Sequence, residues 1–147
     1  AGDYTLNISI DNTSGTGGSV ATVNESSFVF STTADGGSGS DTLMLAGSDD
    51  ALNLTAVSNT AISGIEKIDL DGSGANTLTL NLSDVLDISD TTNQLLVEGG
   101  SDDTVTSTGQ SWSSGGTTSV DGHSFNVYTS GSATLLVETD IGTQTIN

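Results

Sequence analysis

Glycines and acidic residues recur together at the start of apolar, strand-like stretches of this 147-residue chain. The stretch DGGSGSDTLML covers residues 35–45 and DGSGANTLTL covers residues 71–80, so both follow the pattern G-x-G-x-[DN]-x-L-x-L. A shorter copy, GGSDDTVT, covers residues 99–106, and GSDDALNL at residues 47–54 is a weaker echo. Calcium prefers carboxylate and carbonyl oxygens, and glycines let successive carbonyls turn toward one point. The repeated loop therefore predicts calcium sites.

The first copy supports calcium most strongly, because residues 36–44 fit the nine-residue calcium repeat G-G-x-G-x-D-x-U-x in full. Zinc lacks its usual ligands, since the chain has one His and no Cys, and magnesium favours a rigid octahedron with waters. The alternative is a set of tight turns whose Asp and Asn side chains bond their own backbone. The candidate metal-binding residues are Asp35, Gly37, Gly39, Asp41, Asp49, Asp50, Asp71, Gly72, Gly74, Asn76, Gly99, Asp102 and Asp103.

Side chains suited to catalysis are scarce. His123 follows an Asp-Gly turn and is expected to be a surface residue of a hairpin. The pair Asp102-Asp103 could suggest a hydrolase, but neighbouring residues of a strand point to opposite faces. We therefore expect a protein that is not an enzyme. The candidate ligand-binding residues are Asp102, Asp103 and the single tryptophan, Trp112, for which packing in the core is the alternative.

Charge limits the partners. The chain has 19 acidic residues and a single Lys, and its formal net charge is −18. Nothing in it could neutralise phosphates, so nucleic acid and anionic membranes are excluded as partners, while cations are favoured. No apolar run approaches the roughly 20 residues that span a bilayer, so we expect no direct membrane insertion. The chain does not begin with Met, and we expect a piece of a longer protein.

Apolar residues alternate with period two over most of the chain, which is typical of half-buried strands. Asp121-Gly122 predicts a type I′ hairpin, and Gly131 marks a second hairpin. LSDVLDIS predicts a short helix with Ser83 as its N-cap, and a further short helical turn is expected before Gly64. The strand candidates are YTLNISI, SSFVFST, DTLMLAG, ALNLTAV, IEKIDL, NTLTLNL, QLLVEG, DTVTS, FNVY and ATLLVET.

These strands predict an all-β fold in one domain, residues 1–147. We expect a calcium-stabilised β-sandwich with glycine-aspartate loops and one or two short helical turns. Residues 1–26 are expected to form an N-terminal strand and a Gly-rich loop, with the main module at residues 27–147. The alternative is a parallel β-solenoid, but the loops begin about 36 and then about 27 residues apart, which argues against a fixed repeat.

Several stretches together resemble a known module. They are GGSGSDTLML, ISGIEKIDLDGSGANTLTLNLSDVLDISDTTNQLLVEGGSDDTV, and the closing segment GQSWSSGG to VDGHSFNVYTSGSATLLVETDI. From about Ser27 to Ile141 the chain resembles a ligand-binding-region module of the giant RTX adhesins of Gram-negative bacteria. The resemblance implies calcium-dependent β-sandwich architecture, type I secretion and an extracellular place at the bacterial cell surface. In some relatives calcium contacts the carboxylate of a bound peptide C-terminus; others act as a scaffold split by a sugar-binding domain.

Two functions are expected from this resemblance. The first is a calcium-dependent cell-adhesion module that binds a host or neighbouring-cell surface ligand, either a peptide C-terminus or a glycan. The alternative is a structural spacer or scaffold that positions a neighbouring sugar-binding domain. In both, the partners include tandem domains of the same adhesin chain. A weaker third possibility is a calcium-binding appendage of a secreted hydrolase.

Overall fold

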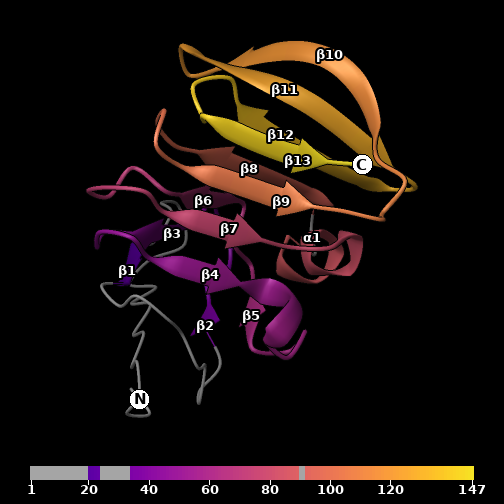
Figure 1. Ribbon diagram of the computed structural model, residues 1–147. Helices are drawn as coiled ribbons and strands as arrows, with labels where there is room; N and C mark the ends of the chain where they lie inside the picture. Colours follow the sequence, from indigo (N-terminus) through magenta and orange to yellow (C-terminus); the bar gives the residue numbers. More distant parts are fainter. Residues whose placement is uncertain (1–19, 24–33, 90–91) are drawn as a thin grey trace.

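The period-two alternation of apolar residues produces short strands arranged in two facing layers (Figure 1). The computed structural model describes residues 20–23, 34–89 and 92–147. The elements are β1 Val20–Val23, β2 Ala34–Asp35, β3 Thr42–Leu45, β4 Ala51–Asn53, the 3₁₀ turn η1 Leu54–Ala56, β5 Ile62–Ser63, β6 Lys67–Asp69, β7 Thr77–Thr79, α1 Leu82–Ile88, β8 Gln94–Glu98, β9 Thr104–Ser107, β10 Ser113–Val120, β11 His123–Ser130, β12 Ala133–Glu138 and β13 Thr143–Ile146.

The strands pair mostly in parallel. Among the described residues, the larger sheet has the order β1-β3-β6-β8-β12-β11-β10 and the smaller sheet has the order β13-β9-β7-β4, while β2 and β5 form a separate pair. Within the described part of the chain, only the β10–β11 and β11–β12 pairs are antiparallel. The connections β3–β4, β6–β7, β8–β9 and β12–β13 each step from the larger sheet to the smaller one. The all-β prediction is confirmed, but the connections are those of a parallel β-solenoid, not of the expected sandwich.

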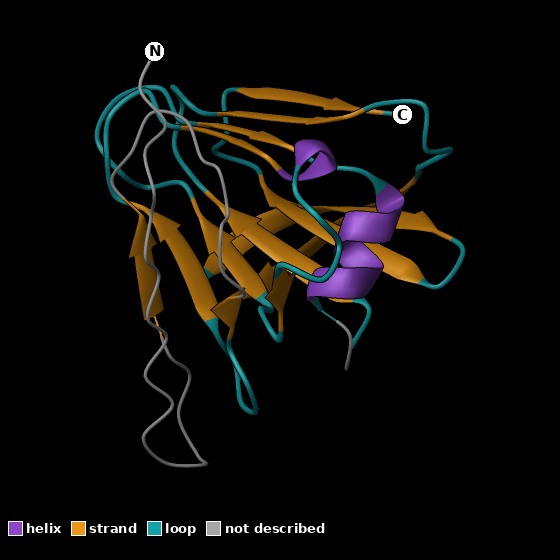
Figure 2. Cartoon of the chain, turned by 90° about the horizontal axis from the view of Figure 1, so that it is seen from below, coloured by secondary structure: helices purple, strands orange, loops and turns teal. Residues whose placement is uncertain are grey.

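The uneven loop spacing has a simple origin. Each return from the smaller sheet to the larger one contains a different insertion: η1 with β5 in the first return, α1 in the second, and the β10–β11 hairpin in the third. Figure 2 shows α1 and η1 along the same side of the two layers. Because the insertions differ in length, stacked coils have no fixed repeat in sequence, and the spacing argument against a solenoid was wrong.

The core lies between the two sheets. Leu43 and Leu45 of β3, Ile68 of β6, Leu78 of β7 and Val105 of β9 are all at most 1% exposed. Burying an aliphatic side chain of this size stabilises a fold by about 1.5–3 kcal/mol. Apolar burial therefore holds the two sheets together along the whole stack.

Local turn chemistry was predicted in part. Asp121 and Gly122 have φ angles of 50° and 92°, as a type I′ turn requires, and Gly131 lies in the second hairpin turn with φ 59°. The short helical turn before Gly64 is η1. The N-cap prediction was wrong: Asn81, not Ser83, caps α1. The Asn81 side chain accepts from the backbone N–H of Asp84, and the Asp84 carboxylate accepts from the N–H of Asn81.

The N-terminal predictions are tested only at one strand. YTLNISI and SSFVFST lie outside the described residues, as does most of the loop expected at residues 11–26. Within that expected loop, Val20–Val23 is the strand β1, which pairs in parallel with β3; the loop prediction was wrong for these four residues. In the described part of the chain no helix reaches the length and apolar character that crossing a membrane requires.

Candidate functional site

One corner of the solenoid stacks three of the predicted ligand residues in a line. Each of the three lies directly before the first residue of a strand of the smaller sheet: Asp50 before β4, Asn76 before β7 and Asp103 before β9. The backbone N–H of Asp50 donates to Oδ1 of Asn76 at 2.8 Å, and the backbone N–H of Asn76 donates to Oδ1 of Asp103 at 2.8 Å. We call these three residues the Asx ladder. It joins three successive coils through hydrogen bonds between side chain and backbone.

Each ladder side chain also closes its own loop. Oδ2 of Asp50 accepts from the N–H of Gly47 at 3.0 Å, and Oδ2 of Asp103 accepts from the N–H of Gly100 at 2.7 Å. Nδ2 of Asn76 donates to the carbonyl of Leu70 at 2.9 Å. The three side chains are buried, and Asn76 is 0% exposed. Bonds of this kind satisfy backbone groups that would otherwise be buried without partners.

The ladder bears directly on the calcium prediction. The Oδ1 atom of Asn76 and both carboxylate oxygens of Asp103 accept hydrogen bonds from backbone N–H groups. Each of these oxygens keeps a further lone pair, so an N–H bond does not prevent coordination of a cation. Asn76 and Asp103 thus make the bonds expected of the tight-turn alternative, in which Asx side chains bond backbone, and calcium binding at these residues stays a prediction.

The glycines at this corner are required by close stacking. A Cβ atom on Gly72 would collide with the carbonyl oxygens of Leu45 and Gly47 in the preceding coil. Ser48 and Ser73 form an isolated parallel bridge between the same two loops. Gly74, at φ 82°, lies beside that bridge. Gly72 is thus explained by the approach of one loop backbone to the next, without an ion.

The first predicted loop lies elsewhere. Asp35 ends β2, and Gly37, Gly39 and Asp41 fall between β2 and β3, at the opposite end of β3 from the Asx ladder. The N–H of Gly37 donates to Asp35 at 3.0 Å, while the buried Asp41 donates its N–H to the Glu66 carboxylate at 2.8 Å. Gly37 and Gly39 have the positive φ angles expected of them, 83° and 136°.

The predicted calcium ligands are therefore divided between two ends of the sheet. Asp49 and Asp102 are exposed beside the ladder, and Gly99 donates its N–H to the Glu138 carboxylate at 3.0 Å. Across the described ranges, 20–23, 34–89 and 92–147, no group of three or more His, Cys, Asp or Glu side chains is arranged to hold a metal ion. Calcium binding stays a prediction for all of the candidate residues.

A cluster of acidic residues lies next to the Asx ladder, where strands of the larger sheet end. Asp69 pairs in register with Glu98, and Glu138 follows Val137, the partner of Val97. Burial raises the pKa of Asp71 above its ordinary value, and the neighbouring carboxylates of Asp69, Glu138, Asp103 and Glu98 raise it further. The acidic corner consists of Asp69, Asp71, Glu98, Asp103 and Glu138. Crowded carboxylates of this kind favour a proton on one of them and attract cations, although in the described ranges they are not arranged as a ligand set for a metal ion.

Two side chains oppose this charge. Nζ of Lys67, the only basic residue of the chain besides His123, donates to Glu98 at 3.0 Å. Nδ1 of His123 pairs with the buried carboxylate of Glu138. The hydrogen bond to Glu138 raises the pKa of His123, so the charged imidazolium is favoured beside the acidic corner. His123 lies at the surface of the hairpin, as expected.

The sequence analysis does not predict the acidic corner, although the sequence contains a pattern that indicates it. The tetrapeptide LLVE occurs twice, at residues 95–98 and 135–138, and both copies end in a corner carboxylate. The ladder also has a signal: SDDALN, GANTLT and SDDTVT align by their strands. Aligning the chain by glycines concealed this register.

Trp112 belongs to the core. It is 8% exposed, it lies in the main hydrophobic cluster, and its indole N–H donates to Oγ of Ser107 at 2.8 Å. An indole enclosed in this way cannot stack on a ligand. The alternative interpretation of Trp112, as a core residue, therefore replaces the ligand-platform prediction.

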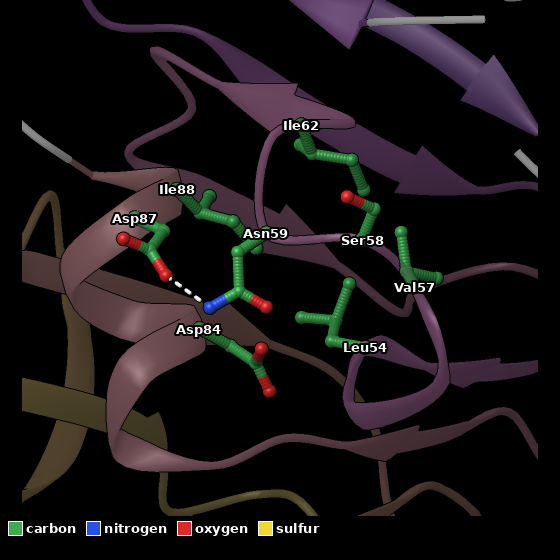
Figure 3. A pocket seen from close by; sticks show the side chains of 8 residues that line it. All are labelled: Leu54, Val57, Ser58, Asn59, Ile62, Asp84, Asp87 and Ile88. Carbon is green, nitrogen blue, oxygen red and sulfur yellow. Dashed lines mark hydrogen bonds between the residues drawn. The ribbon is translucent and has the colours of Figure 1, made fainter.

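Figure 3 shows a small pocket between η1 and α1, where Asn59 donates to Asp87 and the capping residue Asp84 lies beside them. Its space of about 10 Å³ holds about one water molecule. Burial raises the pKa of Asp84, although its bond from the N–H of Asn81 lowers it.

A larger groove of about 380 Å³ lies on the larger sheet. Thr42, Lys67, Leu96 and Glu98 lie along it, and Val120 and Asp121 at the tip of the β10–β11 hairpin line it as well. Its mixture of hydroxyl, carboxylate and apolar groups suits a small polar ligand. This groove and the acidic corner share Glu98.

Comparison with known proteins adds no relative: no protein-family model, curated protein or solved structure matches this chain.

Proposed function

We propose that this chain is a structural module of a large bacterial adhesin, exported by type I secretion and held at the extracellular cell surface. In this function it acts as a spacer or scaffold between tandem domains of the same chain. The single observation that carries the proposal is the Asx ladder, which closes successive coils with hydrogen bonds from the protein itself. A spacer in a stalk has to keep its own coils joined, and these hydrogen bonds join them.

Two further features support a spacer. The core of buried aliphatic residues runs continuously through the stacked coils, which suits a stiff unit. The net charge of −18 keeps such units apart and soluble in a crowded surface layer. The resemblance to RTX adhesin modules supplies the extracellular setting.

The experiment compares thermal unfolding of the intact chain without and with calcium. One melt is recorded in EDTA and the other in calcium at roughly 10⁻³ M, the range in which extracellular modules bind the ion. Emission of the buried Trp112 reports the transition. The proposal predicts a cooperative transition in EDTA, with a modest upward shift on adding calcium because charge is neutralised. A chain that is unfolded in EDTA and folds only with calcium would contradict it.

A second candidate is the calcium-dependent adhesion module. The observation that favours it is the raised pKa of Asp71 among four carboxylates, next to a groove that shares Glu98. In this function a cation at the acidic corner would help to hold a peptide or glycan of a host or neighbouring cell. Asp102 and Asp103 remain its candidate ligand-binding residues, whereas Trp112 does not.

Calorimetric titration separates the two candidates. The adhesion module predicts saturable calcium binding that Asp71→Asn weakens, followed by binding of free C-terminal peptides to the loaded form. The spacer predicts no saturable peptide binding in either state. Asp87→Asn, which also removes one charge but lies on α1, outside both the acidic corner and the groove, serves as the matched control.

A further inference from the structure

The groove on the larger sheet has carboxylates at both of its ends. Glu66 lies directly before β6, at the end of the groove where β3, β6 and β8 begin. Glu98 ends β8 at the opposite end, and Asp121 lines the groove from the tip of the β10–β11 hairpin. That tip lies near the end of β8, because His123 pairs with Glu138, the last residue of β12. The groove is therefore acidic at two separate places.

The register of the strands gives the separation of these places. Lys67 of β6 stands opposite Leu96 of β8, and Asp69 stands opposite Glu98. Glu66 thus precedes the level of Glu98 by three residues. Since each residue advances a strand by about 3.3 Å, the two ends of the groove lie about 10 Å apart along the strands.

The middle of the groove differs from its ends. Lys67 and Leu96 lie there side by side, and Nζ of Lys67 donates to Glu98 at 3.0 Å, which neutralises that carboxylate. His123 is paired with Glu138 in the same way. Among the described residues, no cationic side chain is therefore paired with the carboxylates of Glu66 or Asp121.

Charge complementarity identifies the occupant of the groove as a cation. A cleft in a chain of net charge −18 concentrates positively charged ligands, and acidic groups on its walls strengthen the effect. The ligand needs an ammonium group at each end, facing Glu66 and Asp121. Its middle must be uncharged, because it lies beside the ammonium group of Lys67. A chain of methylene groups meets this condition, since it packs on Leu96 and on the apolar stem of Lys67.

Size and shape agree with such a ligand. The groove has a volume of about 380 Å³, which is in the range of sites for small molecules. A single metal ion cannot reach carboxylates at opposite ends of the groove, and an anion would be repelled by both. We propose that this groove binds a linear aliphatic diamine, with one ammonium group at Glu66 and the other at Asp121. This inference goes beyond the spacer function and does not rest on it.

The test is calorimetric titration of the full chain with three amines that differ in charge or length. It is made at an ionic strength of about 0.15 M, where exposed charges more than about 8 Å apart are largely screened. Diaminooctane is expected to bind at one saturable site. Octylamine lacks one ammonium group, and its affinity should be lower by about two- to fivefold, as expected for one partly exposed ion pair. Diaminobutane is too short to reach both ends and should also bind more weakly.

Two variants remove the proposed charges without removing the side chains. Glu66→Gln keeps an oxygen that can accept the backbone N–H of Asp41, and Asp121→Asn keeps a residue suited to the type I′ turn. Each is expected to lower the affinity for diaminooctane by about two- to fivefold. Asp87→Asn, on α1 and outside the groove, is the matched control and should keep the affinity of the intact chain.

Folding of each variant is checked by circular dichroism. If Glu66→Gln does not fold, Asp121→Asn and the comparison of the three amines on the intact chain carry the test. Absence of saturable diaminooctane binding would overturn the proposal. So would equal affinities for diaminooctane and octylamine, or a loss in Asp87→Asn as large as that in Asp121→Asn, because either result would mean that the amine responds only to the net charge of the chain.

Discussion

Oδ1 of Asn76 accepts a 2.8 Å hydrogen bond from the backbone N–H of Asp50, a residue 26 positions earlier in the chain. The same side chain donates to the carbonyl of Leu70. One buried amide thus joins two coils and closes the loop between two strands.

The first prediction concerns this amide. Asn76→Ala leaves the N–H of Asp50 and the carbonyl of Leu70 buried without their partners. Each such group costs about 1–3 kcal/mol, so the free energy of unfolding should fall by about 2–6 kcal/mol. For a chain of this size that lowers Tm by on the order of 10 °C. Denaturant unfolding followed by Trp112 emission measures the loss.

The control for this variant is Asp102→Asn in the neighbouring loop. Asp102 is exposed, and among the described residues its carboxylate accepts only a long bond, from Ser101 at 3.4 Å. A change of less than about 0.5 kcal/mol is expected there. Equal losses in the two variants would show that the ladder has no special role.

The strands could be predicted because their signal is local. Period-two alternation in DTLMLAG, NTLTLNL and QLLVEG indicates β3, β7 and β8 without knowledge of their partners. The type I′ turn at Asp121-Gly122 is equally local. Strand β13 was missed, because TQTI has a polar residue at an inward position.

The solenoid and the site could not be predicted in the same way. Parallel pairing joins segments separated by η1, α1 and a hairpin of different lengths, and no local pattern encodes which strands meet. Alignment by glycines matched Asp41 with Asn76, whereas the structure stacks Asn76 with Asp50 and Asp103. Only the three-dimensional register brings Glu98 and Glu138 to Asp71.

The second prediction concerns charge at the acidic corner. Folding raises the pKa of Asp71, so the folded chain holds that proton more tightly than the unfolded chain does. The ionised carboxylate therefore destabilises the fold at pH values above its raised pKa, and protonation relieves this as the pH falls through it. Asp71→Asn should raise Tm at neutral pH, and the gain should shrink in acid. Melting curves over a pH series test this.

Asp121→Asn removes the same unit charge at the hairpin tip, and it separates the local effect from the fall in net charge. A larger gain for Asp71→Asn than for Asp121→Asn is expected at neutral pH. A lower Tm for Asp71→Asn in EDTA would contradict the prediction.

The third prediction concerns the indole of Trp112. Its N–H donates to Oγ of Ser107 at 2.8 Å inside the core. Trp112→Phe leaves that hydroxyl buried without its donor, which costs about 1–3 kcal/mol. Ser107→Ala leaves the indole N–H unpaired at a similar cost. Both changes remove the same bond, so the double variant should lose less free energy of unfolding than the two single variants lose in sum. Urea unfolding followed by circular dichroism measures these losses. Additive losses would contradict a direct bond.

The fourth prediction concerns the pair His123–Glu138, which holds the β10–β11 hairpin to the end of β12. Glu138 raises the pKa of His123 above its ordinary value of 6.5, and Glu98 and Asp71 act in the same direction. A group whose pKa is raised by folding stabilises the fold fully below its unfolded pKa and loses that contribution as the pH rises through the folded value. The stabilisation from His123 is therefore present in mild acid and disappears in alkali.

His123→Gln tests this pair, because glutamine can bond to Glu138 but carries no charge. The Tm difference between the intact chain and this variant should be largest below about pH 6, under the ordinary pKa of histidine, and should shrink as the pH rises through the raised pKa of His123. The control is Ser124→Ala, because Ser124 is an exposed neighbour on the same strand. Asn126 is unsuitable as a control position, since its side chain bonds to Gln144. A difference that is constant across the pH series would show that His123 acts through packing and not through its charge.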